Sequence, residues 1–131
     1  PMEFTIILDD YSIITETFKN KYKNSTESKK IATNVDKVMK MINTYDYVGL
    51  YNLLDDEDKN SKFTNINMLV NYISENFYNS NIYEIKSIKL QNNIYISEIK
   101  VYKENEQESE YNNNKILIKL GEDTNFTILF E

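Results

Sequence analysis

The sequence predicts a single α+β domain over residues 1–131, with helices first and an antiparallel sheet after them. Two observations predict this class. Between residues 25 and 78, apolar side chains recur every three or four positions, which is the period of an amphipathic helix. Over residues 82–130 the period changes to two, and polar connections separate the apolar runs. We therefore expect three helices and then a strongly bent four-stranded antiparallel meander that wraps around them.

Residues 3–15 are expected to form an N-terminal extended segment. The first positions alternate in polarity before Asp9-Asp10 interrupts the run, because aspartate side chains bond to nearby backbone amides in turns. The segment is either one kinked strand or two short strands. Phe18 and Tyr22 follow at a spacing of four, which indicates a helical turn that leads to the first long helix.

The first long helix is expected at about residues 25–43. Asn24, with Glu27 three positions later, is typical of an N-terminal cap, in which a short polar side chain accepts a backbone N–H of the first turn. One stripe of this helix is apolar and the other side is rich in lysine, so the stripe must pack on another element. The stripe consists of Ile31, Val35, Val38, Met39 and Ile42.

A second, shorter helix is expected at residues 46–54, with Asp46 near the positive end of the helix dipole. Residues 55–62 are polar and mostly charged, and we expect them to form a solvated connection. The apolar face of the short helix consists of Tyr47, Leu50, Tyr51 and Leu54.

The third helix is expected at residues 64–78. Thr64 is the expected N-cap, and Phe63 and Met68 occupy the positions of a hydrophobic staple around the first turn. Its apolar stripe consists of Ile66, Leu69, Val70, Ile73 and Phe77.

Four strands are expected in the second half of the chain. The connections at 91–93 and 121–125 have hairpin length, and the polar residues 105–113 form a longer, solvated hairpin loop. Short connections imply that strands adjacent in the chain are antiparallel neighbours in the sheet. The expected strands span residues 82–90, 93–104, 114–120 and 124–130.

The apolar alternation changes phase within the first two of these strands. A β-bulge would return the apolar side chains of a strand to one face and would bend the sheet. Alternatively, both faces of the sheet are partly buried. The slips separate Tyr83 and Ile85 from Ile88 and Leu90, and Ile94 and Ile96 from Ile99 and Val101.

Composition excludes several functional classes. A net charge of −6 argues against nucleic acid as a partner, because phosphate binding needs a dense positive surface. The chain has no cysteine and no histidine, which removes disulfides, thiolate chemistry, histidine-dependent triads and histidine-ligated zinc. No apolar run approaches the roughly 18 residues of a membrane span. The chain enters its extended segment directly after Pro1-Met2, so a leader or anchor that precedes this sequence is compatible with it.

Three stretches resemble a known superfamily: LDDYSI at 8–13, INTYDYVGLYNLLDDEDKNSKF at 42–63 and YISENF at 72–77. Together with the order of the elements, they resemble the nuclear transport factor two-like superfamily. Within it they are similar to an uncharacterised group from low-GC Gram-positive bacteria. The resemblance implies a cone-shaped fold, in which a curved sheet wraps around the helices and often leaves a pocket at its open end.

The matching residues are implied to serve packing and turns. Asn43 and Asp46 are implied to be helix caps. Asp58 departs from the group, which tends to have an aromatic residue before Lys59-Asn60, so we expect this turn to be more exposed here. The implied core residues are Ile42, Tyr47, Tyr51, Leu54, Phe63 and Phe77.

The resemblance also implies a location. Members of the group commonly lie behind a membrane anchor on the outer side of the cell. We therefore expect an extracytoplasmic protein that is membrane-anchored or secreted, although the composition itself does not exclude the cytoplasm.

An enzyme built from this sequence would depend on carboxylates, tyrosines and lysines. Ketosteroid isomerase, a member of the superfamily, needs an aspartate base and a tyrosine donor in an apolar cavity. The candidate tyrosines are Tyr47, Tyr51, Tyr83 and Tyr95. The acids nearest to them are Asp46 and Glu98, which are better explained as a helix-terminus residue and a sheet-face residue. No catalytic residues are expected.

The acidic residues after Asp55 match a calcium-binding loop only in part. Asp56, Asp58 and Asn60 match the first three ligand positions of an EF-hand. Ser61, however, stands where that loop needs glycine, and Asn67 stands where it needs a bidentate glutamate. We expect no metal ligands and no cofactor.

The expected function is that of a non-catalytic extracytoplasmic interaction or ligand-binding module. Its partner is an unknown protein or cell-envelope component rather than nucleic acid, and it meets a membrane only through an anchor outside this sequence. Two alternatives stay open: a small-molecule binding protein or enzyme that uses the cone pocket, and a structural spacer that forms a homodimer through its sheet. The residues expected to line a cone pocket are Tyr47, Tyr51, Tyr83, Tyr95 and Phe126.

Overall fold

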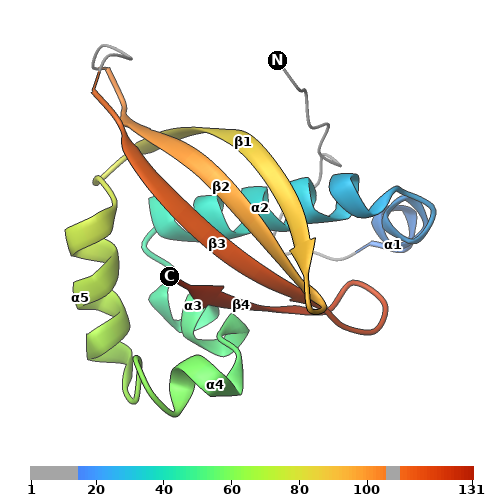
Figure 1. The fold of residues 1–131 in the computed structure, drawn as a ribbon, viewed down its shortest axis with the longest axis horizontal. Helices are drawn as coiled ribbons and strands as arrows, with labels where there is room; N and C mark the ends of the chain where they lie inside the picture. Colours follow the sequence, from blue (N-terminus) through green and yellow to red (C-terminus); the bar gives the residue numbers. More distant parts are fainter. Residues whose placement is uncertain (1–14, 106–109) are drawn as a thin grey trace.

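The computed structural model describes residues 15–105 and 110–131 and has an α+β fold, as the sequence predicts. The helices come first and a four-stranded sheet follows (Figure 1). The helices are α1 (Glu16–Lys23), α2 (Glu27–Asn43), α3 (Tyr47–Leu53), α4 (Asp56–Lys59) and α5 (Ile66–Asn76). The strands are β1 (Asn81–Gln91), β2 (Ile94–Lys103), β3 (Asn112–Leu120) and β4 (Phe126–Phe130).

The expectation of three helices is wrong, because the described residues contain five. The expected helices are α2, α3 and α5, each slightly shorter than predicted. The two additional helices are short, and each begins at a capping side chain. Thr15 Oγ1 accepts the N–H of Phe18 at 3.0 Å at the start of α1, and Asp55 accepts the N–H of Glu57 at 3.2 Å at the start of α4. The expected extended segment at residues 3–15 lies outside the described residues, apart from Thr15.

Two predicted N-caps are displaced by one or two residues. Asn24 is the C-cap of α1, and Thr26 caps α2 by accepting a backbone N–H of the first turn at 3.2 Å. Asn65, not Thr64, caps α5 by accepting a backbone N–H at 3.1 Å. In both places several short polar residues adjoin one another, and the point at which the backbone enters helical geometry decides which one caps.

Asp46 caps α3 as predicted, because its carboxylate accepts the N–H of Gly49 at 3.0 Å. A side chain at Gly49 would collide with this carboxylate, since its Cβ would lie 2.4 Å from Asp46 Oδ2. The implied cap at Asn43 is wrong. Asn43 instead accepts the backbone N–H of Asn81 at 2.9 Å and donates to the carbonyl of Asn81 at 3.0 Å, which fastens the end of α2 to the start of β1.

The sheet is the antiparallel meander that the sequence predicts, in the order β1-β2-β3-β4. The phase slip in β1 is a β-bulge. Ile85 lies opposite Ile99, but Ser87 lies opposite Glu98, so Lys86 is the extra residue. Figure 1 shows β1 curving strongly along its length.

The phase slip in β2 has the other explanation. The register between β2 and β3 is continuous from Tyr95 to Val101, so this part of β2 has no bulge. Ile99 is fully buried against the helices, whereas Ile94 and Ile96 lie on the opposite face and are half-buried. Both faces of the sheet therefore carry apolar side chains.

The main core lies between the helices and the face of the sheet turned toward them, here called the inner face. Figure 1 shows the long strands crossing α2, with α5 beside one end of the sheet and α3 and α4 beside β4. Leu54, just after α3, forms a parallel bridge with Ile128 of β4. Among the helices of residues 15–105 and 110–131, none has the length and hydropathy of a membrane span. The inner-face residues of the core include Ile99, Val101, Ile116, Ile118, Phe126, Ile128 and Phe130.

Candidate functional site

Three of the five residues predicted to line a cone pocket lie where α2 meets the inner face of the sheet. Tyr83 on β1 donates a hydrogen bond to Asp36 Oδ1 at 2.7 Å. Tyr95 on β2 donates one to the carboxylate of Glu27 at the start of α2. Phe126, the first residue of β4, is a buried member of the core. These side chains connect α2 to the sheet.

The other two predicted residues, Tyr47 and Tyr51, belong to α3 and pack against the core from that helix. The Tyr51 hydroxyl donates to the carbonyl of Phe63 at 3.0 Å, and Lys59 Nζ lies 5.6 Å from the Tyr51 ring centroid. None of the five predicted residues lines either of the two pockets described below.

The hydroxyls of Tyr83 and Tyr95 are held in the protonated form. Burial, and then the Asp36 carboxylate, raise the pKa of Tyr83 far above its ordinary value of 10.0. The hydrogen bond to Glu27 is the main cause that raises the pKa of Tyr95 to about 12. A protonated hydroxyl whose hydrogen is already donated is not a base at neutral pH. The arrangement favours a structural role for both side chains.

Aromatic rings fill the end of the inner face near α5. The ring centroid of Phe130 lies 6.2 Å from that of Phe63, 6.4 Å from that of Phe77 and 5.2 Å from that of Tyr72. Such offset and edge-to-face pairs add to the stability that burial gives. Phe63 and Phe77 are two of the residues that the resemblance implies to be in the core, and both are buried.

Asp58 is a buried acid that the sequence reasoning missed. Its residue is only 3% exposed, so the expectation of a more exposed turn at Asp58 is wrong, although most other residues of the connection at 55–62 are exposed. Its carboxylate accepts the N–H of Phe130 at 3.0 Å, and burial raises its pKa above the ordinary value of 3.8. The run of acids after Asp55 is a helix N-terminus signal that could have revealed α4. The hydrogen bond from the N–H of Phe130 to the Asp58 carboxylate ties α4 to β4.

The opposite face of the sheet, here called the outer face, carries an apolar row. Ile96 of β2 lies opposite Leu117 of β3, which lies opposite Leu129 of β4. Ile96 and Leu117 are half-buried and Leu129 is buried, and none of the three belongs to the main core. We call Ile96, Leu117 and Leu129 the outer row.

Charged side chains of both signs flank the outer row. Lys86, Glu98, Lys115 and Glu131 line a shallow pocket of about 440 Å³, together with neighbouring asparagines. Lys115 Nζ lies 3.5 Å from a carboxylate oxygen of Glu131. An apolar strip with a mixed-charge border is typical of a protein-binding surface.

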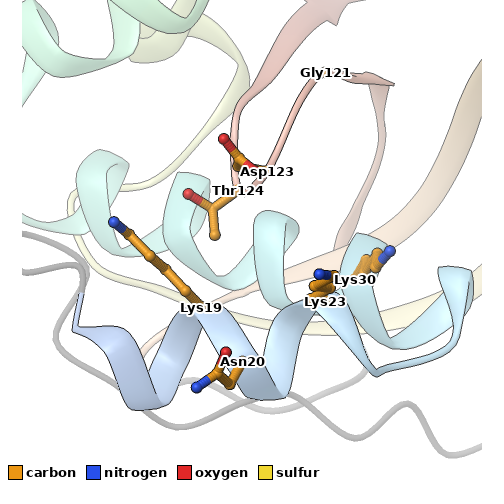
Figure 2. Close-up of a pocket in the computed structure, with 7 residues that line it drawn as sticks. All are labelled: Lys19, Asn20, Lys23, Lys30, Gly121, Asp123 and Thr124. Carbon is orange, nitrogen blue, oxygen red and sulfur yellow. The ribbon is translucent and has the colours of Figure 1, made fainter.

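A second pocket lies between α1, the start of α2 and the hairpin that joins β3 to β4 (Figure 2). Its volume is about 480 Å³. The sequence reasoning did not find it, because its residues come from three separate segments without a shared motif. It is lined by Lys19, Asn20, Lys23, Lys30, Gly121, Asp123 and Thr124.

No group of three or more acidic side chains that could hold a metal ion occurs in the part of the chain that the structure describes. No protein-family model, curated protein or solved structure matches the chain. The superfamily resemblance therefore rests on the order of the elements and on the sequence stretches at 8–13, 42–63 and 72–77.

Proposed function

We propose that this chain is a non-catalytic interaction or ligand-binding module of the nuclear transport factor two-like type that works outside the cytoplasm. Its partner is a protein or other component of the cell envelope, and the outer face of the sheet is the surface that binds it. The observation that carries the proposal is the contrast between a filled inner face and an outer face with an apolar row.

The inner face supports a non-catalytic role. Ile99, Ile116 and Ile118 have no exposed surface, and the tyrosine hydroxyls nearby are already bonded to carboxylates. A ligand that entered between the sheet and the helices would have to displace these contacts, which cost several kcal/mol to break in a packed core (about 2–5 per large side chain).

The outer face supports a partner. Partly exposed apolar side chains give a binding surface its desolvated centre, and charges at its border give orientation and specificity. Ile96 and Leu117 supply the centre, and Glu98 and Lys115 lie two residues further along the same strands, on the same face.

The extracytoplasmic location rests on the sequence resemblance, and a chain without cysteine is compatible with it. An anchor outside this sequence would hold the module at the membrane. Separation of the membrane, envelope and cytoplasmic fractions of the native cells tests this part of the proposal, which predicts that the full-length protein is absent from the cytoplasm.

A second candidate function uses the same face. Lys86 and Lys115 lie near Glu98 and Glu131, so two copies related by a two-fold axis could place lysine opposite glutamate. The chain would then act as a structural spacer that dimerises through its sheet.

One experiment separates the two candidates. A photoreactive phenylalanine analogue replaces Leu117 in the full-length protein in its native cells, and the matched control carries it at Val48, an exposed apolar residue of α3. An adduct with a different protein or envelope component at 117, absent at 48 and lost in an Ile96→Lys background, supports the interaction module. An adduct between two copies supports the spacer. Equal adducts at both positions, or none, contradict both candidates.

A further inference from the structure

The pocket in Figure 2 concentrates positive charge in an acidic protein. Lys19, Lys23 and Lys30 line it together with one carboxylate, that of Asp123, whereas the whole chain has a net charge of −6. None of its lining residues belongs to the outer row or to the pocket beside it. Any ligand of this pocket is thus independent of the partner proposed for the outer face.

The three lysines that line the pocket come from two helices. Lys19 and Lys23 are four residues apart and so share one face of α1. Lys30 comes from α2, and its Nζ lies 5.6 Å from the ring centroid of Tyr22, a buried residue whose hydroxyl accepts a hydrogen bond from the Asn34 amide at 2.9 Å. The ammonium group of Lys30 therefore lies within cation–π distance of a packed aromatic ring.

Two of these lysines lack an anionic partner. Lys19 lies 3.5 Å from Glu16, but among residues 15–105 and 110–131 no carboxylate lies within 4.0 Å of Lys23 or Lys30. Like charges in one pocket repel each other, and a bound anion would remove this cost. A phosphate group, with up to two negative charges and three terminal oxygens, matches two unpaired ammonium groups that line one pocket better than a single carboxylate does.

The hairpin side of the pocket offers a different chemistry. Figure 2 shows Asp123 and Thr124 together on the hairpin, whereas Lys23 and Lys30 come from the helices. The hairpin is closed by a hydrogen bond from the N–H of Gly121 to the carbonyl of Asn125 at 2.8 Å. The Asp123 carboxylate accepts hydrogen bonds and repels further anions, so it selects hydroxyl groups at this end.

We propose that this pocket binds a phosphorylated polyol, such as a sugar phosphate, with the phosphate on Lys23 and Lys30 and the hydroxyls on Asp123 and Thr124. A volume of about 480 Å³ is larger than phosphate alone requires and lies within the usual range of small-molecule pockets, roughly 300–1,000 Å³. Binding is reversible and involves no covalent step.

The test is a titration of the ¹⁵N-labelled chain, followed by NMR, with glucose 6-phosphate, glucose and inorganic phosphate as probes. Glucose 6-phosphate is expected to shift amide signals of residues 19–30 and 121–125 and to bind at least tenfold more tightly than either other probe. The double variant Lys23→Gln/Lys30→Gln is expected to weaken its binding at least tenfold. Asp123→Asn should weaken binding of glucose 6-phosphate but not that of phosphate, and asparagine suits the left-handed backbone of this residue (φ 55°).

The matched control is Lys86→Gln/Lys115→Gln, which removes the same charge from the outer-face pocket. Unchanged binding in this control supports the proposal. Equal weakening in both double variants would show general attraction of anions and would overturn it. The proposal is equally overturned if glucose 6-phosphate binds no more tightly than phosphate, or shifts no signals near the hairpin. None of these outcomes bears on the photo-crosslinking at position 117.

Discussion

The two faces of the sheet are built from the same strands but carry different kinds of side chain. On β3, Ile116 and Ile118 point to the inner face and are fully buried, whereas Leu117 between them points outward and is half-buried. The inner face is closed by helices α2, α3 and α5, whereas the outer row has no part in the main core. The apolar composition of a strand therefore does not say which of its side chains stabilise the fold and which are available to a partner.

The same contrast appears at the two carboxylates that hold β4. Asp58 bonds to the backbone N–H of Phe130, an inner-face residue, and burial raises its pKa. Asp55 lies 3.2 Å from Lys119 and 3.0 Å from Thr127, both on the outer side. Although burial raises the pKa of Asp55, hydrogen bonds from Glu57 N–H, Lys119 and Thr127 lower it more, so the pKa lies below 3.8.

The largest expected effect compares adjacent residues of β3. Ile118→Ala removes a fully buried side chain and is expected to lower the free energy of unfolding by about 3 kcal/mol. Leu117→Ala, on the outer face, is expected to lower it by less than about 1 kcal/mol. Urea unfolding followed by circular dichroism measures both. Similar losses for the two variants would break the distinction between the faces.

The next effect concerns the buried acid. Asp58→Ala leaves the N–H of Phe130 without its acceptor and is expected to cost about 2 kcal/mol. Asp58→Asn keeps an oxygen that can accept this bond and should cost less than half as much. If both variants lower the free energy of unfolding by the same amount, the hydrogen bond to β4 is not the reason that Asp58 stabilises the fold.

The pH dependence of the two carboxylates should have opposite signs. The pKa of Asp58 is raised on folding, so its contribution to stability is present below 3.8 and is lost as the pH rises through its higher folded value. The stability of the wild type relative to Asp58→Asn should thus increase as the pH falls from 7 to 4. The pKa of Asp55 is lowered, so the advantage of the wild type over Asp55→Asn should hold above 3.8 and shrink below it. Urea unfolding at several pH values checks both slopes, and slopes of the same sign would contradict the assignment.

A smaller effect is expected from the two hydrogen bonds that join tyrosines of the sheet to carboxylates of α2. Tyr83→Phe removes a part-buried hydrogen bond to Asp36 and is expected to cost about 1 kcal/mol. Tyr95→Phe removes an exposed bond to Glu27 and is expected to cost under about 0.5 kcal/mol. Thermal unfolding of the two variants measures the difference. A larger loss of stability for Tyr95→Phe than for Tyr83→Phe would contradict the expected order.

The sequence predicts the long elements well, because burial imposes a period on many residues at once. The stripe of α2 from Ile31 to Ile42 follows from such a period, whereas the phase slip in β1 left a bulge as one of two explanations. Short elements escape this reasoning: α4 has four residues, too few for a period to show. The caps of α2 and α5 shift within runs of polar residues, where several side chains fit the same role.

The candidate sites could be predicted least. Tyr83 and Asp36 are 47 residues apart, and only the packing of α2 on the sheet brings them together. The pocket lined by lysines depends in the same way on α1, which the sequence indicates only through the pair Phe18 and Tyr22. Long-range pairs of this kind carry no local signal in the chain.

A Leu117→Lys variant of the full-length protein, with the photoreactive analogue at position 96, separates binding at the outer face from stability of the core. The variant is expected to unfold within about 1 kcal/mol of the wild type, since the outer row is not part of the main core, and to lose its adduct with the partner. A variant that fails to fold, or one that keeps the adduct in full, would contradict the assignment of binding to the outer face.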